Sequence, residues 1–593
     1  MSLVTFVSLS AALAIGFFPV WLLRRTRPAP EVAVVTPRVP LAVVRNSAIA
    51  YVLRTAAFVP LFAWGASGDL LPATVASVCF GVGTWLVYVA RRPLLAFLDD
   101  AITGGESVSV HAFIARAHGN DPRVRRAAAG IALLALLALL TGEALAAYAF
   151  LGPMLMTNTA LGALLMVAAL LALAATAALS GEAGIMHSAQ LQLGILYFGL
   201  FGATLVVLYL HVSARAPMPP HVGLAVAFAP VFAALVLWYR RSRYVDTETI
   251  GNDGTGGSAG VSRAARVLAR FGKILNGALS VLLVLIVILA VMDLRAADAS
   301  ALSRESVAAF GLGQGARIPG PALIALTLLP LSYPLVDVTN WLRLAAARKG
   351  AGLDSGDGAA ELRRAFAVYA LETTLVGLLV CALGAIAGAV FAPKASTDIV
   401  TLFALRIASP DSGVVAIASA LFAVCVVAAA LSTMGTLLGA ALYTLRHDLR
   451  APARHLATRE APAQSDSTSR NRTLLTSLAA LALVAAAVAA LRVGIGGASS
   501  IVVALVSTLC CAQLAFAPLV LGPVIARAPT GNGAVSAGWA LAILVCGFGA
   551  AVAAIVGYLV TGRDVWLWNA VPAALGSGIV LFVLGRAASS RAR

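Results

Sequence analysis

Charge is scarce in this chain. Only 11% of its 593 residues are Asp, Glu, Lys or Arg, whereas soluble globular proteins carry about 25%. Hydrophobic residues make up 61%, and the mean hydropathy is +0.94. This composition excludes a soluble globule and indicates an all-α polytopic membrane protein. Apolar runs close to the ~20 residues that cross a bilayer predict about 15 transmembrane helices, at 3–23, 46–66, 70–90, 127–150, 157–180, 187–210, 222–239, 274–293, 321–345, 365–391, 413–445, 471–491, 498–526, 535–560 and 565–587.

The sequence also lacks the patterns of catalytic and metal sites. Its six cysteines all lie within predicted spans, which favours buried thiols over a disulfide framework. Its histidines occur singly, without the spacing of metal ligands. The polar segment Ile250–Gly260 is rich in glycine, but it has neither the lysine nor the preceding strand of a phosphate loop. We therefore expect no enzyme, no catalytic residues and no bound cofactor.

Acidic residues are fewer than basic ones, 25 against 42, and the net charge is +17. The basic residues alternate with the predicted spans and do not form one patch; for example, Arg24 and Arg25 follow the first span, and Arg91 and Arg92 follow the third. The positive-inside rule then predicts a multi-pass protein of the plasma (inner) membrane, with its N-terminus outside and its C-terminus in the cytoplasm. The expected partners of this charge are membrane lipids with anionic headgroups, and not nucleic acid.

Five stretches carry motifs that occur together in one family of membrane proteins. In chain order they are an amphipathic segment, a Gly-rich loop running to Gln, an aromatic before a broken turn, a Ser/Thr pair after small residues, and a connection rich in Pro and Gly. These stretches are Glu106–Arg125, Gly181–Gln192, Ser332–Lys349, Ala429–Asp448 and Phe516–Gly538. Together they resemble the sodium:solute symporter family, the sodium-coupled cotransporters of proline, sugars and vitamins.

The resemblance implies a five-plus-five inverted-repeat transporter fold, whose broken helices meet at the bilayer midplane. The helices outside the repeats would be one N-terminal helix, an inserted pair and two C-terminal helices. A separate protein partner could dock on the inserted pair, at 222–293. The corresponding division of the chain is 1–45 for the N-terminal helix and link, 46–210 for the first repeat, 211–320 for the inserted pair and loops, 321–526 for the second repeat, and 527–593 for the last two helices.

Ser432 and Thr433 are adjacent hydroxyls in an otherwise apolar span. They either bond back to carbonyls one turn earlier or help to ligate a small hard cation. The resemblance implies the second role, with sodium as the coupling ion and unwound carbonyls within 48–57 as further ligands. Carboxylates common in the family are replaced here by Gly435 and Ala189, so we expect one sodium ion at most.

Four residues are candidates for substrate binding. Arg54 lies near the centre of its span, where a charge is costly unless it is paired or hydrated. It either clamps an anionic substrate or forms an internal ion pair with Glu143, Asp337 or Glu372. Tyr333 stands where the family has an aromatic that covers the substrate, and the alternative is an aromatic at a helix bend. Asp337 follows on the same opened helix, and Glu143 either lines the cavity or neutralises Arg54.

The leading hypothesis is a secondary active transporter that carries a small organic solute, with an anion favoured by Arg54, together with sodium by alternating access. Two alternatives remain open at the level of the sequence. One is a transporter-like membrane sensor or scaffold that acts with a separate partner. The other is a transporter coupled to protons through Asp337 or Glu143.

Overall fold

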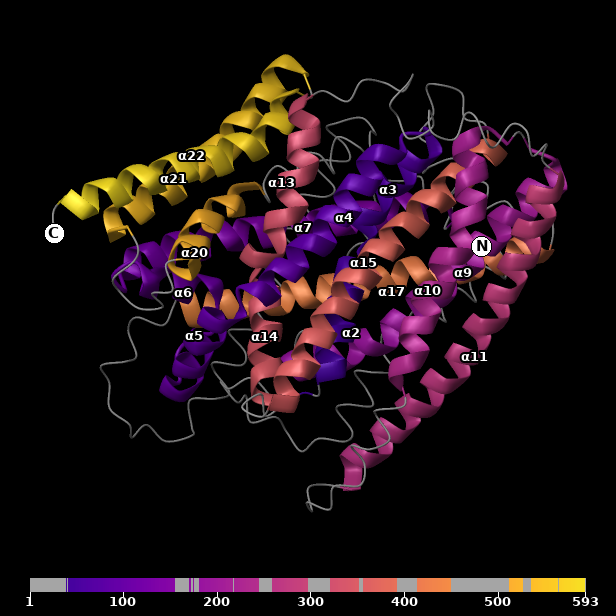
Figure 1. Cartoon of the computed structure of the whole chain (residues 1–593), viewed down its shortest axis with the longest axis horizontal. Helices are drawn as coiled ribbons and strands as arrows, with labels where there is room; N and C mark the ends of the chain where they lie inside the picture. Colours follow the sequence, from indigo (N-terminus) through magenta and orange to yellow (C-terminus); the bar gives the residue numbers. More distant parts are fainter. Residues whose placement is uncertain are drawn as a thin grey trace.

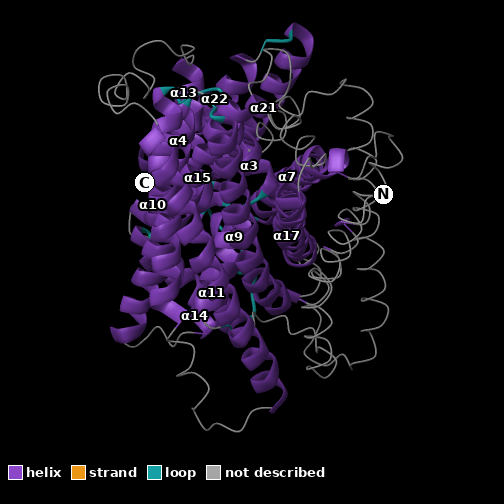
Figure 2. Ribbon diagram, turned by 90° about the vertical axis from the view of Figure 1, so that its right-hand side faces the viewer, coloured by secondary structure: helices purple, strands orange, loops and turns teal. Residues whose placement is uncertain are grey.

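Helices account for every regular element that the structure describes, and no strand occurs among these residues (Figure 2). Nine of the helices are long and apolar enough to cross a membrane, or up to eleven if two bent pairs each count as one span. The prediction of an all-α polytopic membrane protein is therefore confirmed. The computed structural model describes residues 39, 41–154, 170–171, 174, 181–216, 218–244, 259–296, 320–350, 356–391, 413–449, 511–525, 535–563 and 565–591.

The predicted spans at 3–23 and 471–491 lie outside these residues, as do most of 157–180 and the first part of 498–526. The total of about 15 spans therefore stays a prediction. Some helices match the predicted runs closely, such as Leu70–Val89 for 70–90, and others extend beyond them. The predicted run 187–210 belongs to α9, Gly181–Ala214, and the run 274–293 belongs to α11, Ala259–Ala296.

Two helix pairs are broken near their middle. The helices α2, Leu41–Val52, and α3, Thr55–Ala66, meet at a bend of 55°. The helices α13, Gly320–Val336, and α14, Val338–Gly350, meet at a bend of 43°. In α13, Pro330 and Pro334 each remove a backbone donor, which weakens the helix just before its end.

The helices around these pairs form one bundle (Figure 1). The helix α3 packs on α15, Gly356–Phe391, and α13 packs on α4, Leu70–Val89, which also contacts α15. On the other side, α9 packs along α17, Gly413–Tyr443, and α17 contacts α7, Pro122–Met154.

Glycines allow the closest of these contacts. A Cβ atom at Gly384 of α15 would collide with the carbonyl oxygen of Phe62 on α3. One turn later, a Cβ atom at Gly388 would collide with the carbonyl oxygen of Ala66. This Gly-x-x-x-Gly spacing is the pattern by which helices approach each other in membranes.

The predicted spans 222–239 and 274–293 lie on two helices that contact each other, α10, Pro220–Tyr244, and α11. The helix α10 packs on α15, and α11 packs on α9 at one edge of the molecule (Figure 1). His211 of α9 and Asp293 of α11 form a buried ion pair, with Nδ1 and Oδ2 2.7 Å apart. Apolar side chains such as Val284 and Ile288 point outward from α11, as expected of a helix that faces lipid.

Shorter helices close one end of the bundle. These are α5, Arg91–Gly104; α6, Val110–Ala117; the π-helical turn η4, Thr444–Leu449; the 3₁₀ turn η7, Ala512–Ala515; and α20, Phe516–Ile525. Opposite α11, the helices α21, Ala537–Thr561, and α22, Val565–Arg591, lie side by side at the other edge (Figure 1).

Candidate functional site

The two helix breaks bring Arg54 and Tyr333 together. Arg54 precedes α3 with an extended backbone, φ −77° and ψ 148°, so its peptide does not continue α2. Its guanidinium carbon lies 5.7 Å from the ring centre of Tyr333 on α13 and 5.9 Å from that of Tyr51 on α2. These separations allow cation–π attraction to both rings. Arg54 therefore sits between two aromatic rings at the meeting point of the broken helices.

Asp337 occupies the other break and is buried. Its carboxylate accepts hydrogen bonds from the backbone N–H of Thr339, at 3.0 Å, and from the Thr339 hydroxyl, at 2.8 Å, so it caps the start of α14. Arg343 in turn donates from a terminal nitrogen to Thr339 Oγ1, at 3.1 Å, and its guanidinium lies 4.7 Å from the Tyr51 ring centre. The side chain of Asp337 is thus held inside the protein.

A cavity of about 240 Å³ adjoins Arg54. Its wall includes Arg54 and Tyr333 among the four predicted substrate residues, but it includes neither Asp337 nor Glu143. Glu143 on α7 is fully buried and follows the wall residue Gly142 in the sequence. The rest of the wall is mostly apolar and comes from α2, α3, α4, α7, α9, α13, α15 and α17.

Sequence reasoning missed one polar pair at this wall. Tyr197 of α9 lines the cavity and donates its hydroxyl to Oε1 of Glu372 on α15. Both residues are buried. A carboxyl group inside a predicted span was a visible signal for Glu372, which the sequence suggested only as a partner for Arg54. Nothing in the sequence distinguishes Tyr197 from a lipid-facing or core tyrosine.

Ser432 and Thr433 are buried on α17, with 3% and 0% of each residue exposed. Neither hydroxyl has a hydrogen-bond partner within the part of the chain that the structure describes. Two hydroxyls further along the same segment do bond to their own helix. Thr436 donates to the carbonyl of Ser432 and Thr444 to that of Ala440, each at 2.9 Å. The pair therefore does not make the bonds to its own helix that would explain it structurally.

The pair also lies near the first helix break. Leu53, between α2 and α3, packs against a small cluster formed by Leu196 of α9 and Cys425 and Ala429 of α17. Ala429 precedes Ser432 by about one helical turn. No group of three or more His, Cys, Asp or Glu side chains that could hold a metal ion occurs among the described residues.

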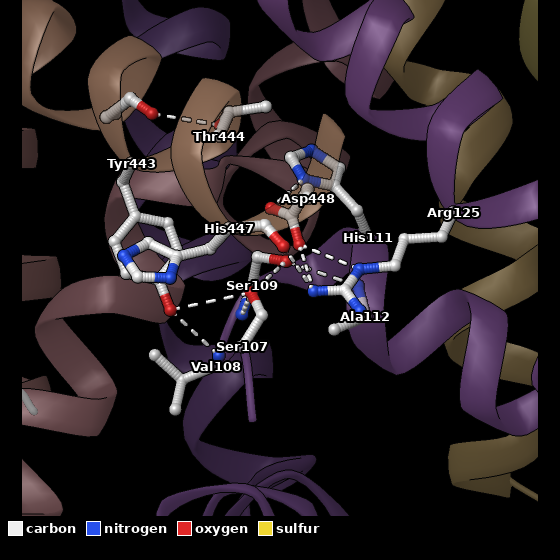
Figure 3. A network of polar contacts seen from close by, with 11 residues as sticks. Ser107, Val108, Ser109, His111, Ala112, Arg125, Tyr443, Thr444, His447 and Asp448 are labelled. Carbon is white, nitrogen blue, oxygen red and sulfur yellow. Dashed lines mark hydrogen bonds and ion pairs between the residues drawn. The ribbon is translucent and has the colours of Figure 1, made fainter. Parts of the chain in front are cut away.

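A polar network joins η4 to α6 and α7 (Figure 3). Asp448 is fully buried, and its carboxylate lies 3.1 Å from Nδ1 of His111 and 3.0 Å from Nε of Arg125. A second guanidinium nitrogen of Arg125 donates to the carbonyl of His447, at 2.7 Å. Beside it, the Tyr443 hydroxyl accepts from the backbone N–H of Val108, at 3.0 Å.

Further polar contacts tie the same end of the bundle together. Arg348 of α14 forms two hydrogen bonds with the carboxylate of Asp99 on α5, at 2.5 and 2.9 Å. His118, at the end of α6, lies 3.0 Å from the carbonyl of Val535 and 3.1 Å from that of Leu519. Burial lowers the pKa of His118, although the two carbonyls act in the opposite direction.

Comparison with known proteins relates the chain to a transporter by structure only. No protein-family model and no curated sequence matches it. A solved structure described as the substrate-bound outward-open state of a Na⁺-coupled sialic acid symporter, with a novel Na⁺ site, is similar over 98% of this chain and 98% of its own. The TM-score is 0.60 and the sequence identity 12%. The chain is thus an integral, multi-pass, all-α membrane protein whose fold is similar to that of this symporter.

Proposed function

We propose that this protein is a secondary active transporter that carries a small organic solute together with sodium by alternating access. The observation that carries the proposal is the pair of buried hydroxyls on Ser432 and Thr433, which bond to no described residue. A buried hydroxyl without a partner costs about 1–3 kcal/mol, so its presence twice in succession calls for a ligand. The similarity to a sodium-coupled symporter supports the same reading.

Sodium would bind between α17 and the break that follows α2. The break interrupts the hydrogen-bond ladder and releases carbonyl oxygens at the end of α2. Leu53 at the break packs against the cluster that includes Ala429, one turn before Ser432, and α2 contacts α17, so both kinds of oxygen would lie in the same region. Hydroxyl and carbonyl oxygens, without a carboxylate, would bind a monovalent cation with modest affinity.

Transport would alternate between states that open the cavity to opposite sides. The division into two five-helix repeats, 46–210 and 321–526, supplies the two units that move against each other. In this cycle the ion pair Arg348–Asp99 and the network around Asp448 would keep one end of the bundle closed. By the positive-inside rule that end would face the cytoplasm, so the closed end would be the inner one.

The test compares sodium with choline at equal ionic strength on the full chain, purified in detergent. Sodium is expected to raise the melting temperature of the wild-type protein but not that of the double variant Ser432→Ala, Thr433→Ala. Thr444→Val is the matched control. Thr444 is buried in the turn that directly follows α17, and its hydroxyl donates to the carbonyl of Ala440, so this variant should keep the sodium response. A sodium response that survives in the double variant refutes the site.

Proton coupling is a second candidate, and the observation that favours it is the buried Glu372 beside the cavity. A carboxyl group that contacts a cavity-lining tyrosine inside the membrane is placed to take up a proton when the cavity opens. In liposomes, an inward proton gradient without sodium would then drive solute uptake, and Glu372→Gln would abolish it. Uptake that needs sodium and persists in Glu372→Gln excludes this candidate.

A further inference from the structure

The helices α4 and α15 pack side by side in opposite directions, and contacts along their length fix how they are aligned. The hydroxyl of Thr374 on α15 donates to the carbonyl of Ser77 on α4, at 3.2 Å. Further along α4, the ring centre of Tyr88 lies 5.9 Å from that of Phe366. As α4 approaches its end, α15 therefore runs back toward its own first turns. The end of α4 and the start of α15 lie at the same level.

Four arginines occur at this common end, two just after α4 and two in the first turns of α15. They are Arg91, Arg92, Arg363 and Arg364. Arg91 follows Tyr88 by three residues, and Arg363 precedes Phe366 by three, so each lies about one turn from the contact between the two rings. Packed helix axes are about 8–10 Å apart, a separation that arginine side chains from both helices can bridge.

These arginines have few partners within the protein. The guanidinium carbon of Arg91 lies 4.0 Å from the ring centre of Tyr88, and the side chain donates to the Tyr88 carbonyl, at 3.1 Å. These contacts fix the position of Arg91. Arg92, Arg363 and Arg364 are exposed, and their side chains form no ion pair or hydrogen bond with any residue that the structure describes.

Carboxylates do not neutralise the four arginines among the side chains that the structure describes. Asp99 and Asp100 of α5 already pair with arginines of α14 and α6. Glu361 is exposed near the start of α15 and offsets one of the four positive charges. Arg45 of α2 also lies near the start of α15, where its guanidinium donates to the side chain of Asn46. Like charges that lie close together repel each other, so this end of the helix pair favours an anion.

The same end of α4 carries an apolar strip on the outside of the bundle. The strip consists of Val82, Leu86 and Val89, which are exposed and follow one another at helical spacing. Val89 is also the last residue of the apolar span. Beside it, the ring of Trp85 lies 4.9 Å from that of Tyr88, and aromatic side chains of this kind are typical of the level of lipid headgroups. An apolar surface for acyl chains therefore leads directly to the arginines.

From these observations we propose that the end of α4 and the start of α15 bind an anionic phospholipid. Its phosphate pairs with Arg92, Arg363 and Arg364 beside the fixed guanidinium of Arg91, and its acyl chains pack along the apolar strip. Guanidinium groups bind phosphate oxygens through two parallel N–H donors. Basic pockets between membrane helices bind lipid headgroups in this way. A zwitterionic lipid is disfavoured, because its choline group brings a further positive charge to the arginines.

The experiment titrates the full chain, purified in detergent, with dioleoylphosphatidylglycerol and, separately, with dioleoylphosphatidylcholine. Native mass spectrometry counts the bound lipids. The first phosphatidylglycerol is expected to bind about tenfold more tightly than the first phosphatidylcholine. An excess of inorganic phosphate is expected to leave it bound, because phosphate has no chains to pack on α4. Equal binding of the two lipids overturns the proposal, and so does displacement of the lipid by inorganic phosphate.

Variants test where the lipid binds. The double variant Arg363→Gln, Arg364→Gln is expected to weaken phosphatidylglycerol binding by about tenfold and to leave phosphatidylcholine binding unchanged. Adding Arg92→Gln should remove the preference between the lipids. The matched control is Arg123→Gln, Arg126→Gln, which removes two exposed arginines near the start of α7 and should keep the wild-type preference. An equal loss in the two double variants means that the lipid responds only to total charge, and overturns the site.

Discussion

Tyr197 of α9 donates its hydroxyl to Glu372 of α15, and this bond joins two helices at the wall of the cavity. Both side chains are buried, so the bond is shielded from water. It fixes the tyrosine ring in the wall and gives one carboxyl oxygen of Glu372 a hydrogen-bond donor inside the membrane. The pair therefore links the shape of the cavity to the packing of α9 against α15.

Tyr197→Phe is expected to lower the melting temperature, because it removes this donor from a buried carboxyl group at a cost of about 1–3 kcal/mol. Glu372→Gln is expected to cost less, since its amide oxygen can accept the same bond. The measurement is thermal unfolding in detergent. Tyr209→Phe on the same helix is the control, since Tyr209 is 41% exposed. Equal melting temperatures for the two phenylalanine variants would contradict the structural role of the pair.

The sequence predicted the helices better than it predicted the cavity. Apolar runs identify membrane spans because length and composition alone decide whether a segment can cross a bilayer. The break after α2 contains neither proline nor glycine, so only the family resemblance pointed to the range 48–57. The wall residues Phe58, Trp64 and Phe80 could not be predicted, because uniformly apolar helices give no signal of which face meets which neighbour.

Ser432 and Thr433 show a second limit. Their position was evident, but whether a hydroxyl bonds to its own helix depends on side-chain conformation, which the sequence does not determine. The structure separates them from Thr436 and Thr444, which do make that bond. Asp448 is similar, because the sequence marks it as the end of a helix but gives no sign that Arg125, 323 residues away, is its partner.

Asp448→Asn is expected to destabilise the protein by about 1–3 kcal/mol. It removes the charge that Arg125 and His111 face, and the Arg125 side chain is only 25% exposed. The control is Asp100→Asn, whose side chain is 58% exposed in its pair with Arg116 and which should change stability by less than about 0.5 kcal/mol. The measurement is the melting temperature of both variants in detergent. Equal decreases in melting temperature would mean that the buried network adds no stability.

Gly384→Ala is expected to lower the melting temperature, because the added Cβ collides with the carbonyl of Phe62 and pushes α15 away from α3. Overpacking of this kind costs about 1–3 kcal/mol. Gly130→Ala is the matched control on α7, where a Cβ meets no atom within 4 Å, and it should be neutral or stabilise by up to about 1 kcal/mol. A Gly384→Ala protein as stable as Gly130→Ala would show that the two helices are less closely packed.

His118 predicts a dependence of stability on pH. Burial lowers its pKa, so the folded protein binds a proton there less readily than the unfolded chain, whose histidines titrate near about pH 6.5. Above that pH the residue contributes no pH dependence. Below it the unfolded state takes up a proton that the folded state does not, so stability falls as the pH drops.

The melting temperature of the wild-type protein should therefore fall between about pH 6.5 and pH 5, and His118→Gln should reduce that fall. Arg116→Gln, two residues earlier and without a titrating group near pH 6, should keep the wild-type profile. The opposite result, a fall that is steeper in His118→Gln, would mean that the folded protein holds His118 protonated. Both ring nitrogens would then donate, one to Val535 and one to Leu519, and those carbonyls would outweigh burial.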